Sequence, residues 1–204
     1  MAVHQSPKSF LIAAALGVLV AAGTAPRADG PTRRESAALK EKVATITAHG
    51  ERATNQARRT TVSENEVNSY LVYDAREQLP PGVVDPSVTI LGTGRVSGRA
   101  VVDLDAVRRQ KAPTSLLDPM NYLTGRLPVT ATGMLTTSNG VGRFELESAR
   151  VSSIPVPKML LQEIVSYYSR TPDNPSGISL DDPFALPARI REIQVERGQA
   201  IIVQ

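Results

Sequence analysis

The chain has 204 residues, of which 41 % are hydrophobic and only 4 % aromatic, with no tryptophan and no cysteine. This length fits one ordinary domain with a short N-terminal appendage, and an aliphatic core of adequate size. The absence of cysteine excludes a disulfide framework, a thiol nucleophile, thiolate metal ligation and a lipidated N-terminal cysteine. The formal net charge of +3 is small and is unevenly distributed.

Residues 1–25 have the pattern of a signal peptide. Lys8 precedes a continuous apolar run from Phe10 to Ala22, and small residues follow that run. The run has the length of a signal-peptide core and is shorter than an ordinary transmembrane helix. We expect cleavage after Ala22 or Gly23 and export to the periplasm or the outer face of the inner membrane. An uncleaved membrane anchor is the alternative.

A basic stretch follows the signal peptide and the polar linker 26–33. Residues 27–59 carry eight Lys or Arg and four Asp or Glu. Such a stretch can contact the anionic head groups of a membrane surface, or it can be the solvated face of a helix. Nucleic acid is not expected as a partner, because the chain lacks interleaved basic and aromatic residues.

The N-terminal third of the domain predicts two helices and one strand. A helix is expected from Arg34 to about His49, with Leu39, Val43 and Ile46 along one side. Residues 56–62 alternate weakly and predict a first strand. Ser63 and Glu66 have the spacing of a capping box, which opens a second helix that ends before Pro80.

From residue 83 the hydrophobic period changes from 3.6 to 2, which predicts strands. The expected strands contain Val88 and Ile90, then residues 96–104, and then the longest, 126–138. Asn139-Gly140 predicts a hairpin to a partner strand at 142–151. The apolar cluster 116–123 predicts a packed loop, and two final strands are expected at 190–196 and 199–204.

Ile154-Pro155-Val156-Pro157 interrupts the strands and introduces an amphipathic helix from Lys158 to Arg170. One apolar helix among strands must bury its stripe against a sheet. Antiparallel connections dominate, so we expect an α+β fold. In this fold a strongly curved antiparallel sheet wraps around one long helix and carries an N-terminal helical segment. Residues 34–204 form a single domain.

The side chains needed for catalysis are scarce. His4 lies in the predicted signal peptide, so His49 alone cannot build a histidine-dependent triad or a multi-histidine metal centre. The acidic pairs Asp103/Asp105 and Asp181/Asp182 are interpreted as solvated loop acids. We therefore expect no enzyme, no cofactor and no metal, and an exported hydrolase is the weakest of the functional hypotheses.

The stretch Thr61–Leu71, with Ser-Glu-x-Glu-Val-Asn-x-Tyr-Leu at its centre, precedes curved strands, a Gly-bearing hairpin and the Pro-Val-Pro helix. This motif and this order of elements resemble those of small bacterial envelope proteins of the tubular lipid-binding (TULIP) kind, including the LmeA-like and YceB-like groups. The resemblance covers roughly residues 35–204. It implies a curved sheet around a long helix, with an apolar groove for acyl chains. The missing lipobox cysteine separates the chain from the lipoprotein members, and its length allows only one such unit.

The resemblance implies that a lipid or another apolar small molecule binds between the helix and the facing strands. The residues expected to line that groove are Leu160, Leu161, Ile164, Val165, Tyr168, Val96, Ala100, Val102, Val129, Ala131 and Leu135. Periodicity alone favours a closed core, in which these side chains fill one another. The chain would then be an exported scaffold or interaction domain without a ligand.

Overall fold

The computed structural model describes residues 30–52, 56–110, 124–170 and 174–204. The predicted signal peptide and the apolar cluster 116–123 lie outside these residues. Within the described ranges, no helix is both long enough and apolar enough to cross a membrane.

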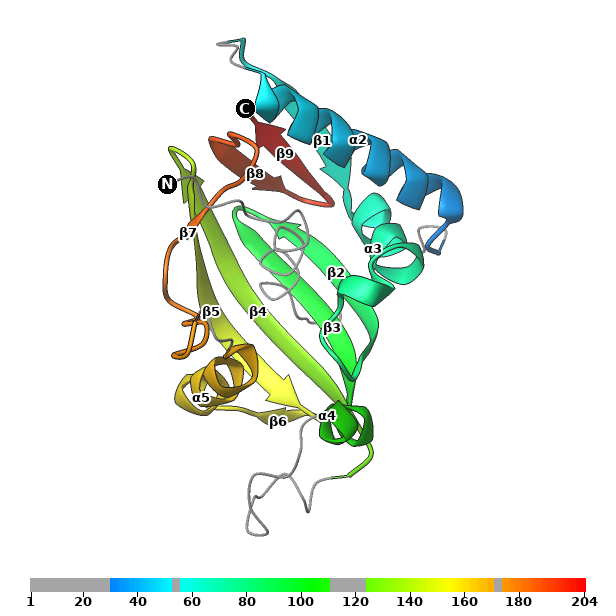
Figure 1. Cartoon of the computed structure of the whole chain (residues 1–204), viewed down its shortest axis with the longest axis vertical. Coiled ribbons are helices and arrows are strands. Elements are labelled where there is room, and N and C mark those ends of the chain that lie inside the picture. Colours follow the sequence, from blue (N-terminus) through cyan, green and yellow to red (C-terminus); the bar gives the residue numbers. More distant parts are fainter. Residues whose placement is uncertain (1–29, 53–55, 111–123, 171–173) are drawn as a thin grey trace.

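The larger of two sheets has six strands, all antiparallel, in the order β2-β3-β4-β5-β6 with β7 added to β5 (Figure 1). Its strands are β2 (Val83–Gly92), β3 (Arg95–Asp103), β4 (Arg126–Ser138), β5 (Val141–Val151), β6 (Ile154–Pro155) and β7 (Phe184–Ala185). The predicted change to strand periodicity at residue 83 and the hairpin at Asn139-Gly140 are both confirmed.

The smaller sheet has three antiparallel strands in the order β1-β9-β8. They are β1 (Arg59–Ser63), β8 (Glu192–Glu196) and β9 (Gln199–Val203). The sequence predicts all three strands but not the pairing of β1 with β9, which joins the two ends of the domain. Local periodicity contains no information on such a distant partner.

The helices are α2 (Arg33–Glu51), α3 (Glu64–Tyr73), α4 (Leu104–Gln110) and α5 (Lys158–Ser169), with a 3₁₀ turn at Arg76–Gln78. Helix α2 continues through Gly50 to Glu51, past the predicted end at about His49. A Cβ on Gly50 would come within 2.3 Å of the carbonyl oxygen of Ala188. The glycine therefore permits close packing inside the helix and does not end it.

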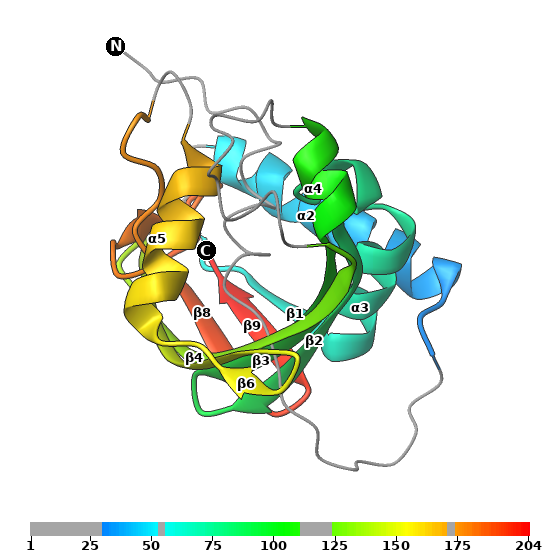
Figure 2. The same ribbon diagram turned by 90° about the horizontal axis from the view of Figure 1, so that it is seen from below.

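The six-stranded sheet is strongly curved (Figures 1 and 2). Helix α5 lies beside its β5 side, and α3 packs against β2 at the opposite edge. Register shifts in the β2–β3 and β4–β5 pairs mark bulges, which bend strands and increase their twist. The expected α+β class, with a curved antiparallel sheet and an N-terminal helical segment, is confirmed.

Three clusters of buried side chains form the described core. The first joins α2 and α3 through Leu39, Val62, Tyr70, Leu71 and Ala75. The second joins α2 to the residues before β8 through Ile46, Leu186 and Ile190. The third joins the two sheets through Ile90, Val96 and Val195. The apolar side predicted for the first helix is therefore the side that packs.

Candidate functional site: the apolar face of the curved sheet

The register assigns the side chains of the large sheet to an apolar face and a polar face, because residues directly opposite in an antiparallel pair share a face. Val96, Ala100 and Val102 pair with Gly133, Val129 and Leu127. Ala131 pairs with Gly98 on one side and Ala149 on the other. The opposite face carries arginine, serine and threonine, with Arg99 opposite Thr130 and Ser97 opposite Thr132.

One end of the apolar face is covered by the three-stranded sheet. Val96 and Ile90 pack with Val195 of β8, and Leu135 and Phe144 contact the same cluster. Val96 retains 6 % exposure. The predicted lining residues Val96 and Leu135 therefore contribute to the core between the sheets.

Small side chains occupy the rows beyond this core cluster. Gly98, Ala131 and Ala149 lie side by side across three strands, and Ala100 lies in the next row beside Val129. Ala100 and Ala149 are buried, whereas Val102, Val129 and Ala131 are only half-buried. Small side chains therefore keep the sheet surface low at this end of the apolar face.

A bulge places part of this row on the apolar face. Simple alternation after Phe144 and Leu146 would continue with Ser148 and Arg150. The pairing of β4 with β5 instead shifts by one residue between Thr132 and Gly133, so that Ala149 opposes Ala131. Sequence periodicity did not identify Ala149 as a lining residue, because strict alternation cannot show where an extra residue is inserted.

Helix α5 is held by its polar side. The Gln162 side-chain oxygen accepts from the Leu180 N–H at 2.7 Å, and the Ser169 hydroxyl accepts from the Ile178 N–H at 2.6 Å. Lys158 forms an ion pair with Asp181 at 2.5 Å. These contacts fix the rotation of α5 against the segment 174–182.

The predicted apolar stripe of α5 is divided by this orientation. Leu161 and Val165 are half-buried, whereas Leu160 is 49 % exposed beside Met159, which is 76 % exposed. The side chains of Ile164 and Tyr168 lie outside the described part of the structure. Leu161 and Val165 are thus the described helix residues available to face the sheet.

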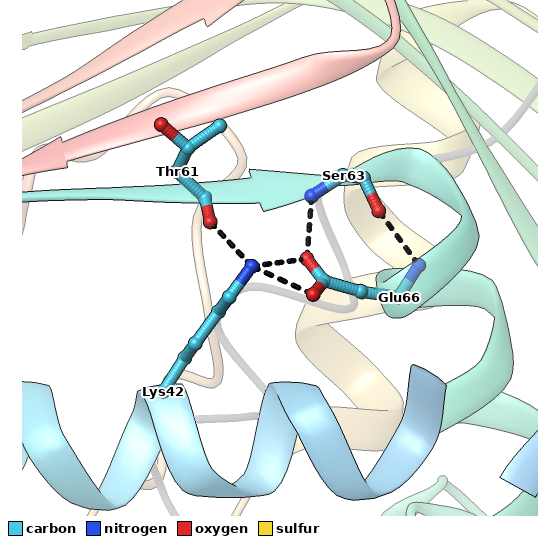
Figure 3. A network of polar contacts seen from close by, with 4 residues as sticks. All are labelled: Lys42, Thr61, Ser63 and Glu66. Atoms are coloured by element: carbon cyan, nitrogen blue, oxygen red, sulfur yellow. Dashed lines mark hydrogen bonds and ion pairs between the residues drawn. The ribbon is translucent and has the colours of Figure 1, made fainter. Parts of the chain in front are cut away.

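The motif that carries the family resemblance has structural roles. The Ser63 hydroxyl accepts from the Glu66 N–H at 3.2 Å, and Glu66 accepts from the Ser63 N–H at 2.8 Å, which confirms the capping box (Figure 3). Glu66 also accepts two hydrogen bonds from Lys42. The motif therefore attaches α3 to α2 and β1. Its Tyr70 and Leu71 belong to the core cluster against which Val88 packs, and Val88 lies opposite Gly98 on the apolar face.

The candidate acidic residues have structural partners as well. Asp103 accepts from the Ala106 N–H at 2.9 Å and pairs with Arg126, and both contacts hold the pKa of Asp103 below its ordinary value. Asp105 accepts from the Gly125 N–H. Among the described residues, no group of three or more His, Asp or Glu side chains is arranged to hold a metal ion.

No family model matches the chain, and no curated protein matches it. Among solved structures, the chain is similar to a lipopolysaccharide binding protein with 17 % sequence identity and a TM-score of 0.22. The match covers 72 % of this chain and 40 % of the other. A similarity of this size carries no argument about function.

Proposed function

We propose that this chain is an exported, non-catalytic protein of the bacterial cell envelope that binds a lipid or another apolar ligand between the curved sheet and α5. The observation that carries the proposal is the division of the apolar face into two parts. The part near β8 is packed by Ile90, Val96 and Val195. The part beyond it presents the small side chains of Ala100, Ala131 and Ala149.

The chemistry of that second part favours an apolar ligand. Its side chains are alanine, valine and leucine, so a ligand there would gain mainly from removal of apolar surface from water. Leu161 and Val165 of α5 are the side chains we propose for the opposite wall. An acyl chain matches such a surface because it has no polar group that would need a buried partner.

The non-catalytic and exported parts of the proposal rest on the sequence. His49 is the one histidine beyond the signal-peptide pattern. It lies in the last turn of α2, and its Nε2 atom is 3.2 Å from the carbonyl oxygen of Gln56. The basic Lys8 followed by the apolar run Phe10–Ala22 supports export.

Paired substitutions on neighbouring residues of β4 test the proposal. Ala131→Trp places an indole ring on the apolar face, whereas Thr130→Trp places the same ring on the polar face. If a ligand occupies the apolar face, Ala131→Trp should abolish binding of a fluorescent fatty-acyl probe while stability falls by less than about 1 kcal/mol, below the usual range for overpacking. Thr130→Trp should bind the probe as the wild type does.

Leu161→Ala tests the helix side of the same site. It should weaken probe binding, with a smaller loss of stability than the roughly 2–5 kcal/mol of a packed core leucine. The closed-core alternative predicts a different set of results. The wild type would bind no probe, Ala131→Trp would cost about 1–3 kcal/mol through overpacking, and Leu161→Ala would cost as much as a core leucine.

A further inference from the structure

The most exposed large apolar side chains of the described structure gather where β6 meets α5. We call residues Ile154–Leu160 the β6–α5 corner. Met159 is 76 % exposed, Ile154 68 % and Leu160 49 %. The corner lies at the same end of the molecule as α4, away from the three-stranded sheet (Figures 1 and 2).

The backbone of the corner is held in place by several contacts. Strand β6 pairs with β5, and the Val156 N–H donates to the Ala149 carbonyl oxygen at 2.9 Å. The Arg150 guanidinium donates to the Ser153 carbonyl oxygen at 2.9 and 3.2 Å. Ser152 and Ser153 both adopt positive φ, at 49° and 73°, a conformation that is unfavourable for non-glycine residues. These contacts therefore hold the backbone of the β6–α5 corner in a defined conformation, in which its apolar side chains are exposed.

The charged side chains around the corner include two basic ones with long aliphatic stems, Lys158 and Arg150, together with the carboxylate of Asp181. Lys158 lies between the apolar positions, and its side chain is 43 % exposed although it pairs with Asp181. Arg150 is exposed beside the turn. Lysine and arginine at such positions can extend their charged ends to lipid phosphates while their stems stay in the interface.

We propose that the β6–α5 corner inserts shallowly into an anionic lipid bilayer. Ile154, Met159 and Leu160 enter the boundary between head groups and acyl chains, and Lys158 and Arg150 contact the phosphates. A bilayer fits this surface better than a protein does, because the hot spots of protein interfaces are enriched in tryptophan and tyrosine, which the corner lacks. The corner offers protruding aliphatic side chains and no aromatic one. This contact concerns the outer surface and does not require a ligand on the apolar face of the sheet.

The absence of cysteine allows a test by site-specific labelling of the full chain. Met159→Cys, labelled with an environment-sensitive fluorophore, reports on the corner. Val141→Cys is the control, because Val141 is 47 % exposed at the opposite end of β5. Both proteins contain the N-terminal apolar run, so any attachment through that run is common to both. Each is mixed with vesicles of phosphatidylcholine and phosphatidylglycerol.

The proposal predicts a blue-shifted emission of the Met159→Cys label with these vesicles, together with quenching by lipids that carry a quencher on the acyl chain. The Val141→Cys label should show neither effect. Adding Lys158→Glu to the Met159→Cys protein should weaken the response several-fold. An absent shift, or equal shifts at both positions, would overturn the proposal. A shift that appears without vesicles and grows with protein concentration would overturn it too, in favour of self-association.

Discussion

At the scale of single residues, Glu66 joins three elements of the fold. It is 9 % exposed, and its carboxylate accepts from the Ser63 N–H and from Lys42, whose ammonium also donates to the Thr61 carbonyl oxygen at 2.7 Å (Figure 3). A nearly buried carboxylate must be compensated by such donors. The same carboxylate therefore caps α3 and fixes α2 against β1.

The capping role of Ser63 predicts a moderate loss of stability without loss of function. Ser63→Ala removes the acceptor for the Glu66 N–H and should lower the free energy of unfolding by about 1 kcal/mol. Denaturant unfolding measures this change, and Ser148→Ala on the exposed part of β5 serves as the control. Unchanged unfolding combined with lost ligand binding would show that Ser63 belongs to a functional site.

Asp74 predicts a pH dependence of stability. Hydrogen bonds from Lys40 and from the Ser36 hydroxyl hold the pKa of Asp74 below its ordinary value of 3.8. Because the folded pKa is the lower one, the stabilisation is present above about pH 4 and is lost as the pH falls through the folded pKa.

Asp74→Asn should therefore reduce stability at neutral pH and flatten its decline at acid pH, as measured by denaturant unfolding at a series of pH values. Ser36→Ala keeps the carboxylate and removes one donor, so it should flatten the decline less. Parallel pH profiles for the wild type and Asp74→Asn would show that this contact does not contribute to stability.

At the scale of elements, α3 protects the edge of the large sheet. The Asn68 side chain donates to the Val88 carbonyl oxygen at 2.8 Å and accepts from the Val88 N–H at 2.6 Å, as a neighbouring strand would. Glu64 accepts from the Ile90 N–H at 2.7 Å. An open strand edge is a site for pairing with other chains, so these side chains also guard against aggregation.

Asn68→Ala should expose this edge. The loss of two hydrogen bonds should cost about 1–3 kcal/mol, and the Val88 amide should exchange its hydrogen faster. Hydrogen exchange and denaturant unfolding measure the two effects. Asn65→Ala, on the same helix, is the matched control and should change neither. Equal exchange at Val88 in the two variants would contradict the role of Asn68.

Elements with a local signal were predictable from the sequence. The capping box at Ser63 and the turn at Asn139-Gly140 depend on residues close together in the chain, and both predictions are confirmed. The continuation of α2 through Gly50 was not predicted, because it depends on the approach of Ala188. The same reason explains why the β1–β9 pairing was missed.

At the scale of the whole molecule, the two sheets meet at one end of the apolar face. The Gly198 N–H donates to the Ile90 carbonyl oxygen at 2.8 Å, and the Thr137 hydroxyl accepts from the Ile193 N–H at 2.7 Å. These bonds fix the small sheet over Val96 and Leu135. The rows of Ala100 and Ala131 lie further along the sheet.

Only part of the candidate site could be predicted from the sequence. Alternation placed Ala100, Val129 and Ala131 on one face, as the register shows. It could not show that β8 covers Val96, since β8 lies about a hundred residues further along the chain. It also missed the exposure of Met159, because the helical stripe gives the apolar face of α5 but not its rotation.

Native mass spectrometry of the full chain, purified from a bacterial host in mild detergent, tests the central claim most directly. The proposal predicts an added mass that matches an acyl lipid, recovered by organic extraction and absent from the Ala131→Trp variant. The Thr130→Trp variant should retain that mass. A wild-type protein that carries no lipid, together with no binding of added phospholipid or fatty acid, would contradict the proposal and favour a closed core.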